Sequence, residues 1–180
     1  MAGSLIKIDE FTISSAVASV TLGGGSSGSS GLNASIDSTY DVYMIRINNV
    51  TGTTEPNAIN IRFTVSGTAD TSANYDWAHT VLRTNSSFQN QSNTNQTSVN
   101  GLDSTGTSTS ETVNAIYHLF NFNNASEYSF ITYEASARLS TAELNARQGG
   151  AVLTVAQATD GFQFFMTNDN IEVGSKFVLY

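Results

Sequence analysis

The sequence predicts an all-β protein: a single antiparallel β-sandwich or jelly-roll-like domain with long polar loops and at most one short helix. Short segments in which apolar and polar residues alternate recur along the chain, as expected of half-buried strands. The polar residues are mostly Ser, Thr, Asn and Gly, a mixture that favours strands and turns. Hydrophobic residues make up 39% of the 180 residues and include 10 Phe and 7 Tyr, so one core can form without disulfides, for which there is no Cys. We therefore expect residues 1–180 to form one domain.

The chain opens with two expected strands, over residues 5–8 and 16–22. In the second of these strands Val20 and Leu22 share one face. Residues 23–31 consist only of Gly and Ser, which cannot fill a core. We expect a flexible Gly/Ser loop there.

The two clearest strands are expected over residues 42–48 and 59–65. One face of the first carries Tyr43, Ile45 and Ile47, and in the second Ile59, Ile61, Phe63 and Val65 alternate strictly with polar residues. The residues between them include Gly52 and the single proline, Pro56, a composition typical of a turn. We expect the two strands to pair antiparallel.

A further strand is expected over residues 75–84, followed by a long polar loop over residues 85–110. The loop is nearly all Ser, Thr, Asn, Gln and Gly, and a run of this length suggests a functional or interface loop. Its few apolar residues, Phe88, Val99 and Leu102, would attach it to the surface or to a neighbouring subunit.

The second half returns to short strands, and we expect eight to ten in the whole chain. They are bounded by Asn, Asp or Gly and cover residues 112–122, 127–135, 151–156, 161–166 and 176–180. Residues 140–147 alone look helical, because Ser140 can cap a helix, Glu143 follows three residues later and Gly149 comes just after the end.

The charge pattern argues against nucleic acid and the hydropathy pattern against a membrane. The net charge is −8, and the 7 basic residues are scattered rather than gathered into a stripe that could neutralise phosphates. No apolar run approaches the ~18 residues of a membrane span. The first residues also lack the pattern of a secretory signal, so we expect a protein made and assembled in the cytoplasm.

Two motif matches in the Gly/Ser tract carry no enzymatic prediction. Residues 23–28 fit both a dinucleotide-binding pattern and a nucleophile-elbow pattern, but no helix signal follows them, and both chemistries need one. His79 and His118 lie in expected strands without the further ligands that a zinc site requires. We expect no catalytic residues, no metal and no cofactor.

Aromatic residues give the best small-ligand hypothesis. Tyr75 and Trp77 are two residues apart, hence on one face of a strand, where they could stack against a sugar ring. Core packing is the competing interpretation. The oxygen-rich segment at residues 168–170 could bind calcium, although it matches no complete calcium loop and turn formation explains the same residues.

Several segments together resemble a known group of proteins. Residues 36–44 read IDSTYDVYM and are followed by RINNV at 46–50; further along come FTVSG at 63–67, NY at 74–75, HLFN at 118–121, GFQFFM at 161–166 and NIEVGSKFVLY at 170–180. In this order they resemble structural proteins of tailed bacteriophages, especially marine and cyanobacterial ones. The resemblance implies a component of the virus particle and supplies no active-site residues.

We therefore expect a structural component of a bacteriophage virion that acts by protein–protein packing, as a capsid decoration (cement) protein on the particle exterior. Its expected partners are other virion proteins, either the major capsid protein or tail proteins, and further copies of itself in a homotrimer. The alternative is a tail-fibre or tail-associated module that binds a host-surface saccharide through Tyr75 and Trp77.

Overall fold

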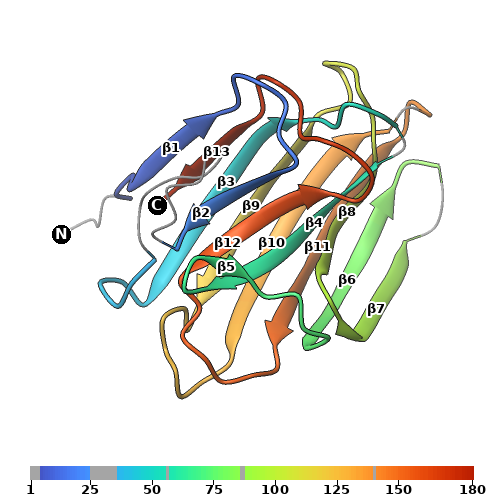
Figure 1. Cartoon of the computed structure of the whole chain (residues 1–180). Coiled ribbons are helices and arrows are strands. Elements are labelled where there is room, and N and C mark those ends of the chain that lie inside the picture. Colours follow the sequence, from blue (N-terminus) through green and yellow to red (C-terminus); the bar gives the residue numbers. More distant parts are fainter. Residues whose placement is uncertain (1–4, 25–35, 56, 86–87, 140) are drawn as a thin grey trace.

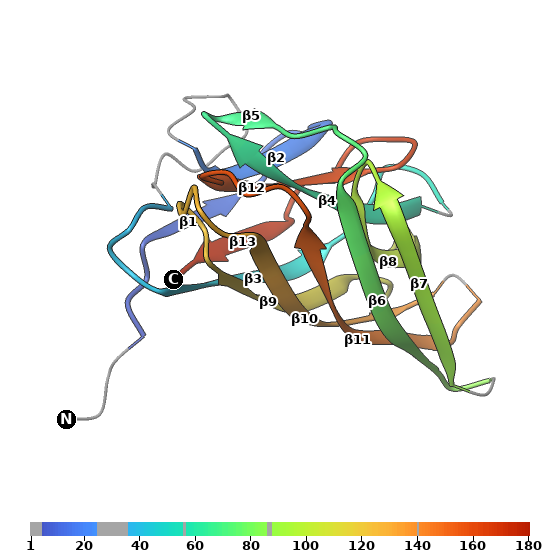
Figure 2. The ribbon, with the colours of Figure 1, turned by 90° about the horizontal axis from the view of Figure 1, so that it is seen from below.

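Two antiparallel sheets packed face to face make up the fold (Figures 1 and 2). The computed structural model describes residues 5–24, 36–55, 57–85, 88–139 and 141–180. Within these residues it contains thirteen β-strands and no helix. The predicted all-β sandwich is confirmed.

The larger sheet has eight strands in the order β1-β13-β3-β9-β10-β11-β6-β7. Their bounds are β1 Asp9–Thr12, β3 Val42–Val50, β6 Tyr75–Arg83, β7 Gln89–Gln96, β9 Val113–Phe120, β10 Ser129–Arg138, β11 Leu144–Leu153 and β13 Lys176–Leu179. The smaller sheet has the order β2-β12-β4-β5, with β8 also paired to β4. Its strands are β2 Ser19–Gly23, β4 Asn57–Val65, β5 Thr68–Ala69, β8 Val99–Thr105 and β12 Gly161–Met166.

Eight of the strands have the connectivity of a jelly roll. If β1, β2, β3, β4, β8, β9, β12 and β13 are numbered one to eight, the larger sheet begins one-eight-three-six and the smaller reads two-seven-four-five. The remaining strands are insertions, of which β6, β7, β10 and β11 widen the larger sheet. Figure 2 shows this widened end curving towards β8.

Aromatic side chains fill the space between the sheets. Phe162 and Phe164 of β12 have ring centroids 4.9 Å apart, and both rings contact Tyr117 of β9 in the opposite sheet at 5.5 and 5.4 Å. Phe63 of β4 lies 5.7 Å from Phe162. Since these strands come from both sheets, the rings join the two layers into one core.

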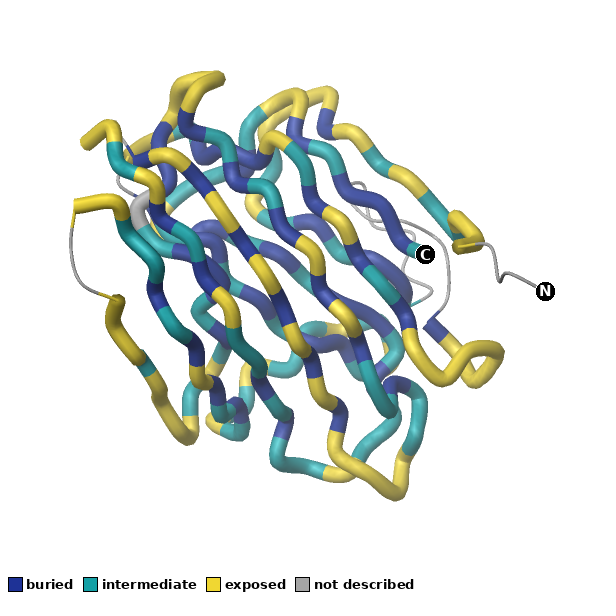
Figure 3. Tube along the Cα trace, turned by 180° about the vertical axis from the view of Figure 1, so that it is seen from behind, coloured by how far each residue is buried: buried dark blue, intermediate teal, exposed yellow. Residues whose placement is uncertain are grey.

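The central strands of the larger sheet alternate between its two faces. In β10 every second residue from Ser129 to Ala137 is buried, and the residues between them are exposed. Figure 3 shows the same alternation across the neighbouring strands. One face of this sheet therefore belongs to the core and the other, here called the outer face, is open.

The two strands with the clearest alternation lie in opposite sheets. The strand expected over 42–48 is β3, which pairs β13 and β9, and the strand expected over 59–65 is β4, which pairs β12, β5 and β8. Their predicted pairing as a hairpin is wrong. Both strands direct an apolar face to the core, and alternation alone does not distinguish pairing in one sheet from packing across two.

The helix expected over residues 140–147 is also wrong. Residues 144–147 begin β11, which pairs β10 on one side and β6 on the other. Ala142 has a φ of 69° and its N–H donates to the Leu139 carbonyl at 2.9 Å, so a tight turn precedes the strand. A helix of this length is marginal by itself, whereas the strand satisfies its backbone groups on both sides.

Strands replace most of the long polar loop expected over residues 85–110. This range holds β7 and β8, and Val99 and Leu102 of β8 are fully buried. At the chain start, residues 5–8 precede β1 rather than forming a strand. The first two residues of the expected Gly/Ser loop, Gly23 and Gly24, lie at the end of β2 and have positive φ angles of 78° and 76°. Residues 25–31 of that loop lie outside the described residues.

Core packing gives a first prediction. Phe162→Ala removes a fully buried ring at the centre of the aromatic cluster and should lower the free energy of unfolding by about 3–5 kcal/mol. Phe130→Ala is the matched control, since that ring is 42% exposed on the outer face, and should cost less than about 1 kcal/mol. Urea unfolding measures both. Equal losses would contradict the assignment of the two faces.

Candidate functional site

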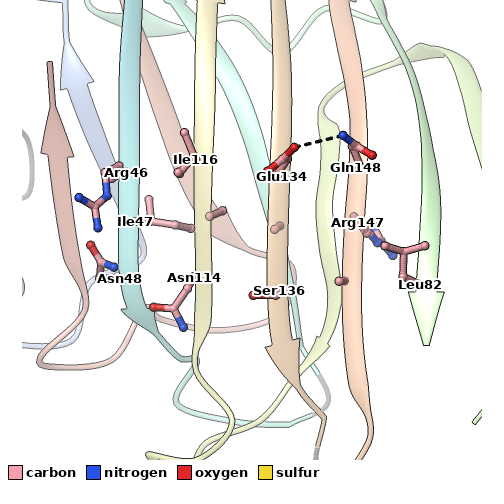
Figure 4. A pocket seen from close by; sticks show the side chains of 13 residues that line it. Arg46, Ile47, Asn48, Leu82, Asn114, Ile116, Glu134, Ser136, Arg147 and Gln148 are labelled. Carbon is pink, nitrogen blue, oxygen red and sulfur yellow. Dashed lines mark hydrogen bonds between the residues drawn. The ribbon is translucent and has the colours of Figure 1, made fainter. Parts of the chain in front are cut away.

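The outer face of the larger sheet carries a shallow groove over β3, β9, β10 and β11, with Leu82 of β6 at its far end (Figure 4). Its volume is about 510 Å³. The small side chains of Ser136 and Ala146 leave it open in the middle. Alternation places these residues outward, because their neighbours in sequence face the core.

Polar groups from four strands surround this groove. Arg46 and Asn48 come from β3 and Asn114 from β9, while the Gln148 amide on β11 donates to the Glu134 carboxylate on β10 at 3.1 Å (Figure 4). A guanidinium, amides and a carboxylate can bind a polar, uncharged ligand or a polypeptide chain. The groove is open and shallow, without an enclosed reaction chamber.

An apolar belt crosses the same face next to the groove. It consists of Val42, Phe120, Phe130 and Val152, which pair in register across β3, β9, β10 and β11. Val42 is 45% exposed and Phe130 is 42% exposed. Four adjacent outward-facing apolar side chains on an open face are a feature of binding surfaces.

Hollows lie at both ends of the apolar belt. One, of about 260 Å³, is lined by Leu5, Ile6, Tyr40, Val42 and Tyr180, among others. The other, of about 510 Å³, runs from Phe130 and Val152 towards β6 and β7. The belt and its hollows thus extend the apolar surface over most of the width of the sheet.

The sequence did not single out the belt or the groove. The available signal was weak: Val42, Phe120, Phe130 and Val152 are apolar residues at strand positions, and each has at least one apolar neighbour in sequence. Only the register between four strands brings them side by side.

Tyr75 and Trp77, the predicted saccharide contacts, both face the core. Tyr75 is fully buried, accepts a hydrogen bond from the Phe63 N–H at 3.0 Å and donates one to the Asp70 carbonyl at 3.0 Å. Trp77 is 8% exposed, and its ring stacks on His79 with centroids 4.9 Å apart. Neither ring offers a free face to a sugar, because both side chains lie on the face of β6 that points into the core. The core-packing interpretation fits both residues.

His79 belongs to a buried polar cluster where β6, β10 and β11 of the larger sheet contact β8 of the smaller one. Its Nδ1 lies 2.8 Å from the Tyr133 hydroxyl and its Nε2 lies 3.1 Å from Gln91 Oε1. A neutral imidazole that accepts from Tyr133 and donates to Gln91 satisfies both contacts. Burial lowers the pKa of His79, and the nearby Arg147 guanidinium acts in the same direction.

Arg147 carries the only fully buried charge of this cluster among the described residues. Its side chain is 0% exposed and pairs with the Asp103 carboxylate, which is 31% exposed. Its Nη1 also donates to Asn100 Oδ1 at 2.9 Å. Asp103 and Asn100 lie on β8 and Arg147 on β11, so this ion pair joins the two sheets.

The remaining candidate ligands do not converge. Asp160 accepts from the Thr64 hydroxyl at 2.7 Å and the Gly67 N–H at 2.9 Å, and thereby fixes a turn. Hydrogen bonds from Thr53 are the main cause of the lowered pKa of Asp169 in the 168–170 segment. In the described part of the chain no three His, Asp or Glu side chains could hold a metal ion. The same part contains no helix long and apolar enough to cross a membrane.

The buried ion pair gives a second prediction. Asp103→Ala leaves the guanidinium of Arg147 buried without its carboxylate and should lower the free energy of unfolding by about 3–5 kcal/mol. Arg147→Met removes the charge but keeps much of the volume, so it should cost less than half as much. Chemical denaturation of both variants and of the double variant checks this. The double variant should resemble Arg147→Met alone, and strict additivity would contradict the coupling.

The His79 environment gives a third prediction. Because the folded protein holds the pKa of His79 below that of a solvated histidine, the unfolded chain binds more protons as the pH falls through about 6.5. The free energy of unfolding should therefore decrease on acidification from pH 7.5 to 5.5, and His79→Gln should reduce this decrease. Fluorescence of Trp77, the single tryptophan, reports the unfolding. Phe130→Ala, which keeps both histidines and changes only the outer face, is the control and should keep the wild-type slope.

Comparison with known proteins gives no further constraint. No protein-family model, no curated protein and no solved structure matches this chain. The functional proposal therefore depends on the outer face of the larger sheet and its apolar belt.

Proposed function

We propose that this chain is a structural component of a bacteriophage virion, a decoration or cement protein on the particle exterior that acts by protein–protein packing. The observation that supports the proposal most is the apolar belt, which lies in register across four strands on an otherwise open sheet face. The resemblance of the sequence to tailed-phage structural proteins supports it as well.

The apolar belt fits a packing role better than a catalytic one. Apolar surface removed from water contributes roughly 25 cal/mol per Å², and a stable protein contact buries on the order of 1,000 Å² or more. The belt and its two flanking hollows provide a surface of the required kind. A net charge of −8 would meanwhile limit unspecific adhesion to packaged DNA and keep the free chain soluble.

We further propose a homotrimer and assembly in the host cytoplasm. Three copies held together would present three belts to the shell at once. Weak contacts that are engaged together bind far more tightly than each one alone. The partner in this arrangement is the major capsid protein.

The second candidate is a tail-fibre or tail-associated module that binds a host-surface saccharide. The outer-face groove favours it, because Arg46, Asn48, Asn114 and Glu134 offer donors and acceptors that suit sugar hydroxyls. With Tyr75 and Trp77 buried, the groove takes the place of the aromatic contact expected from the sequence.

The fourth prediction tests the packing role. Phe130→Glu places a carboxylate in the apolar belt and should reduce binding to particles that lack this protein at least about tenfold, since a desolvated unpaired charge costs more than the ~1.4 kcal/mol of that factor. Gln163→Glu adds the same charge on β12 of the smaller sheet and should bind like the wild type. Co-sedimentation with particles measures both variants.

Electron cryomicroscopy of the whole particle locates the protein. Density repeated over the icosahedral shell would agree with the decoration role, and density confined to the tail would favour the second candidate. In that case Asn114→Ala, in the groove, should weaken adhesion to host polysaccharide. Absence of the chain from purified particles would refute both.

A further inference from the structure

The larger sheet ends in two edge strands that differ in length and charge. At one end, β1 has four residues, and its Glu10 forms ion pairs with Lys7 at 3.4 Å and with Lys176 at 3.0 Å. At the other end, β7 has eight residues, QNQSNTNQ, without a charge or a proline. Proteins commonly protect edge strands with charges, prolines, bulges or short length. Charge, proline and short length are all missing from β7.

The free side of β7 is regular over most of the strand. Residues 89–93 pair with β6 in continuous register, and the one register shift lies beyond them, near Asn95, whose φ is 55°. By contrast, β8 at an edge of the smaller sheet is broken by two register shifts and carries Asp103. Residues 89–93 therefore present an uninterrupted row of backbone donors and acceptors.

We propose that β7 is a self-association edge, which pairs antiparallel with β7 of a second copy of this chain about a two-fold axis. The two larger sheets then form one continuous sheet through the dimer. A two-fold contact uses the same segment from both copies, so that segment must be complementary to itself.

Charge is the first reason to expect a second copy as the partner. The chain has 15 acidic and 7 basic residues, and two copies repel each other over most of their surface. Within β7 every possible antiparallel register sets only amide and hydroxyl side chains opposite each other. These groups both donate and accept hydrogen bonds, so no register creates a like-charge pair.

Phe88 is the second reason. This residue directly precedes β7 and, at 73% exposed, is the most exposed large hydrophobic side chain of the described residues. In an antiparallel pair centred anywhere from residue 89 to residue 92, Phe88 lies opposite a β7 residue of the second copy. Pairing would cover a ring that the single chain leaves in water.

The inference is independent of the proposed virion role. The apolar belt lies on β3, β9, β10 and β11 and stays uncovered when β7 edges meet. A trimer formed elsewhere on the surface would still have its β7 edges free, and these could link it to neighbouring trimers.

A charge-swap experiment forms the fifth prediction. Ser92 is exposed near the middle of β7, so Ser92→Lys should keep the fold but place a like charge from each copy within the paired segment. Sedimentation analysis of the full chain should show a concentration-dependent assembly in the wild type, weakened about tenfold or more in Ser92→Lys and likewise in Ser92→Glu. An equal mixture of the two variants should restore it. Gln163→Lys, on the other sheet, is the control and should assemble like the wild type.

The absence of Cys allows a direct test of the contact. Single cysteines placed in turn at residues 89–93 should give a rapid disulfide dimer at the position nearest the two-fold axis, because equivalent residues there are about 5 Å apart. A wild-type chain that stays unassembled, or identical masses for the wild type, Ser92→Lys and Gln163→Lys, would overturn the proposal. So would crosslinking at every β7 position no faster than at Gln163→Cys. Asn90→Lys charges the same edge but lies outside the belt and its hollows, so this variant should still bind particles and keeps the virion question separate.

Discussion

The aromatic layer between the two sheets is the constraint on which the rest of this structure depends. Phe162 and Phe164 of the smaller sheet contact Tyr117 of the larger one, and Phe63 extends the contact along β4. Because every second side chain of these strands packs in the core, the side chains between them point outward. The groove and the apolar belt are therefore consequences of how the core is filled.

The insertions into the jelly roll change what the larger sheet can do. Strands β6, β7, β10 and β11 widen it beyond the eight-strand pattern and bring Phe130 and Val152 into line with Val42 and Phe120. The inserted strands β6, β10 and β11 contact β8 of the smaller sheet, and there apolar packing gives way to the cluster of His79, Tyr133, Arg147 and Asp103. A buried ion pair there joins β8 to β11. It adds little net stability, because the cost of removing both charges from water offsets most of their attraction.

The two sides of the larger sheet thus have different chemistry. The inner side is a continuous core, while the outer side combines a polar groove with an apolar belt and ends in an uncharged edge strand. None of these outer features is enclosed, so each is accessible to a large partner. A protein that works by packing would need such a surface.

The sequence by itself determined the fold class and much of the core. Alternation and aromatic content predicted a sandwich, and the inward faces of Tyr43 and Ile45 and of Ile59 and Ile61 were correct because a half-buried strand leaves a period-2 pattern. Tertiary structure decided the rest. Residues 144–147, within the expected helix at 140–147, form a strand because they pair with β10 on one side and β6 on the other. The polar residues of β7 form a strand because β6 offers them unpaired backbone donors and acceptors. The apolar belt depends on the register between strands, and the burial of Trp77 depends on how the sheets pack. Local residue patterns specify neither the register nor the packing, because both join segments that are far apart in the sequence.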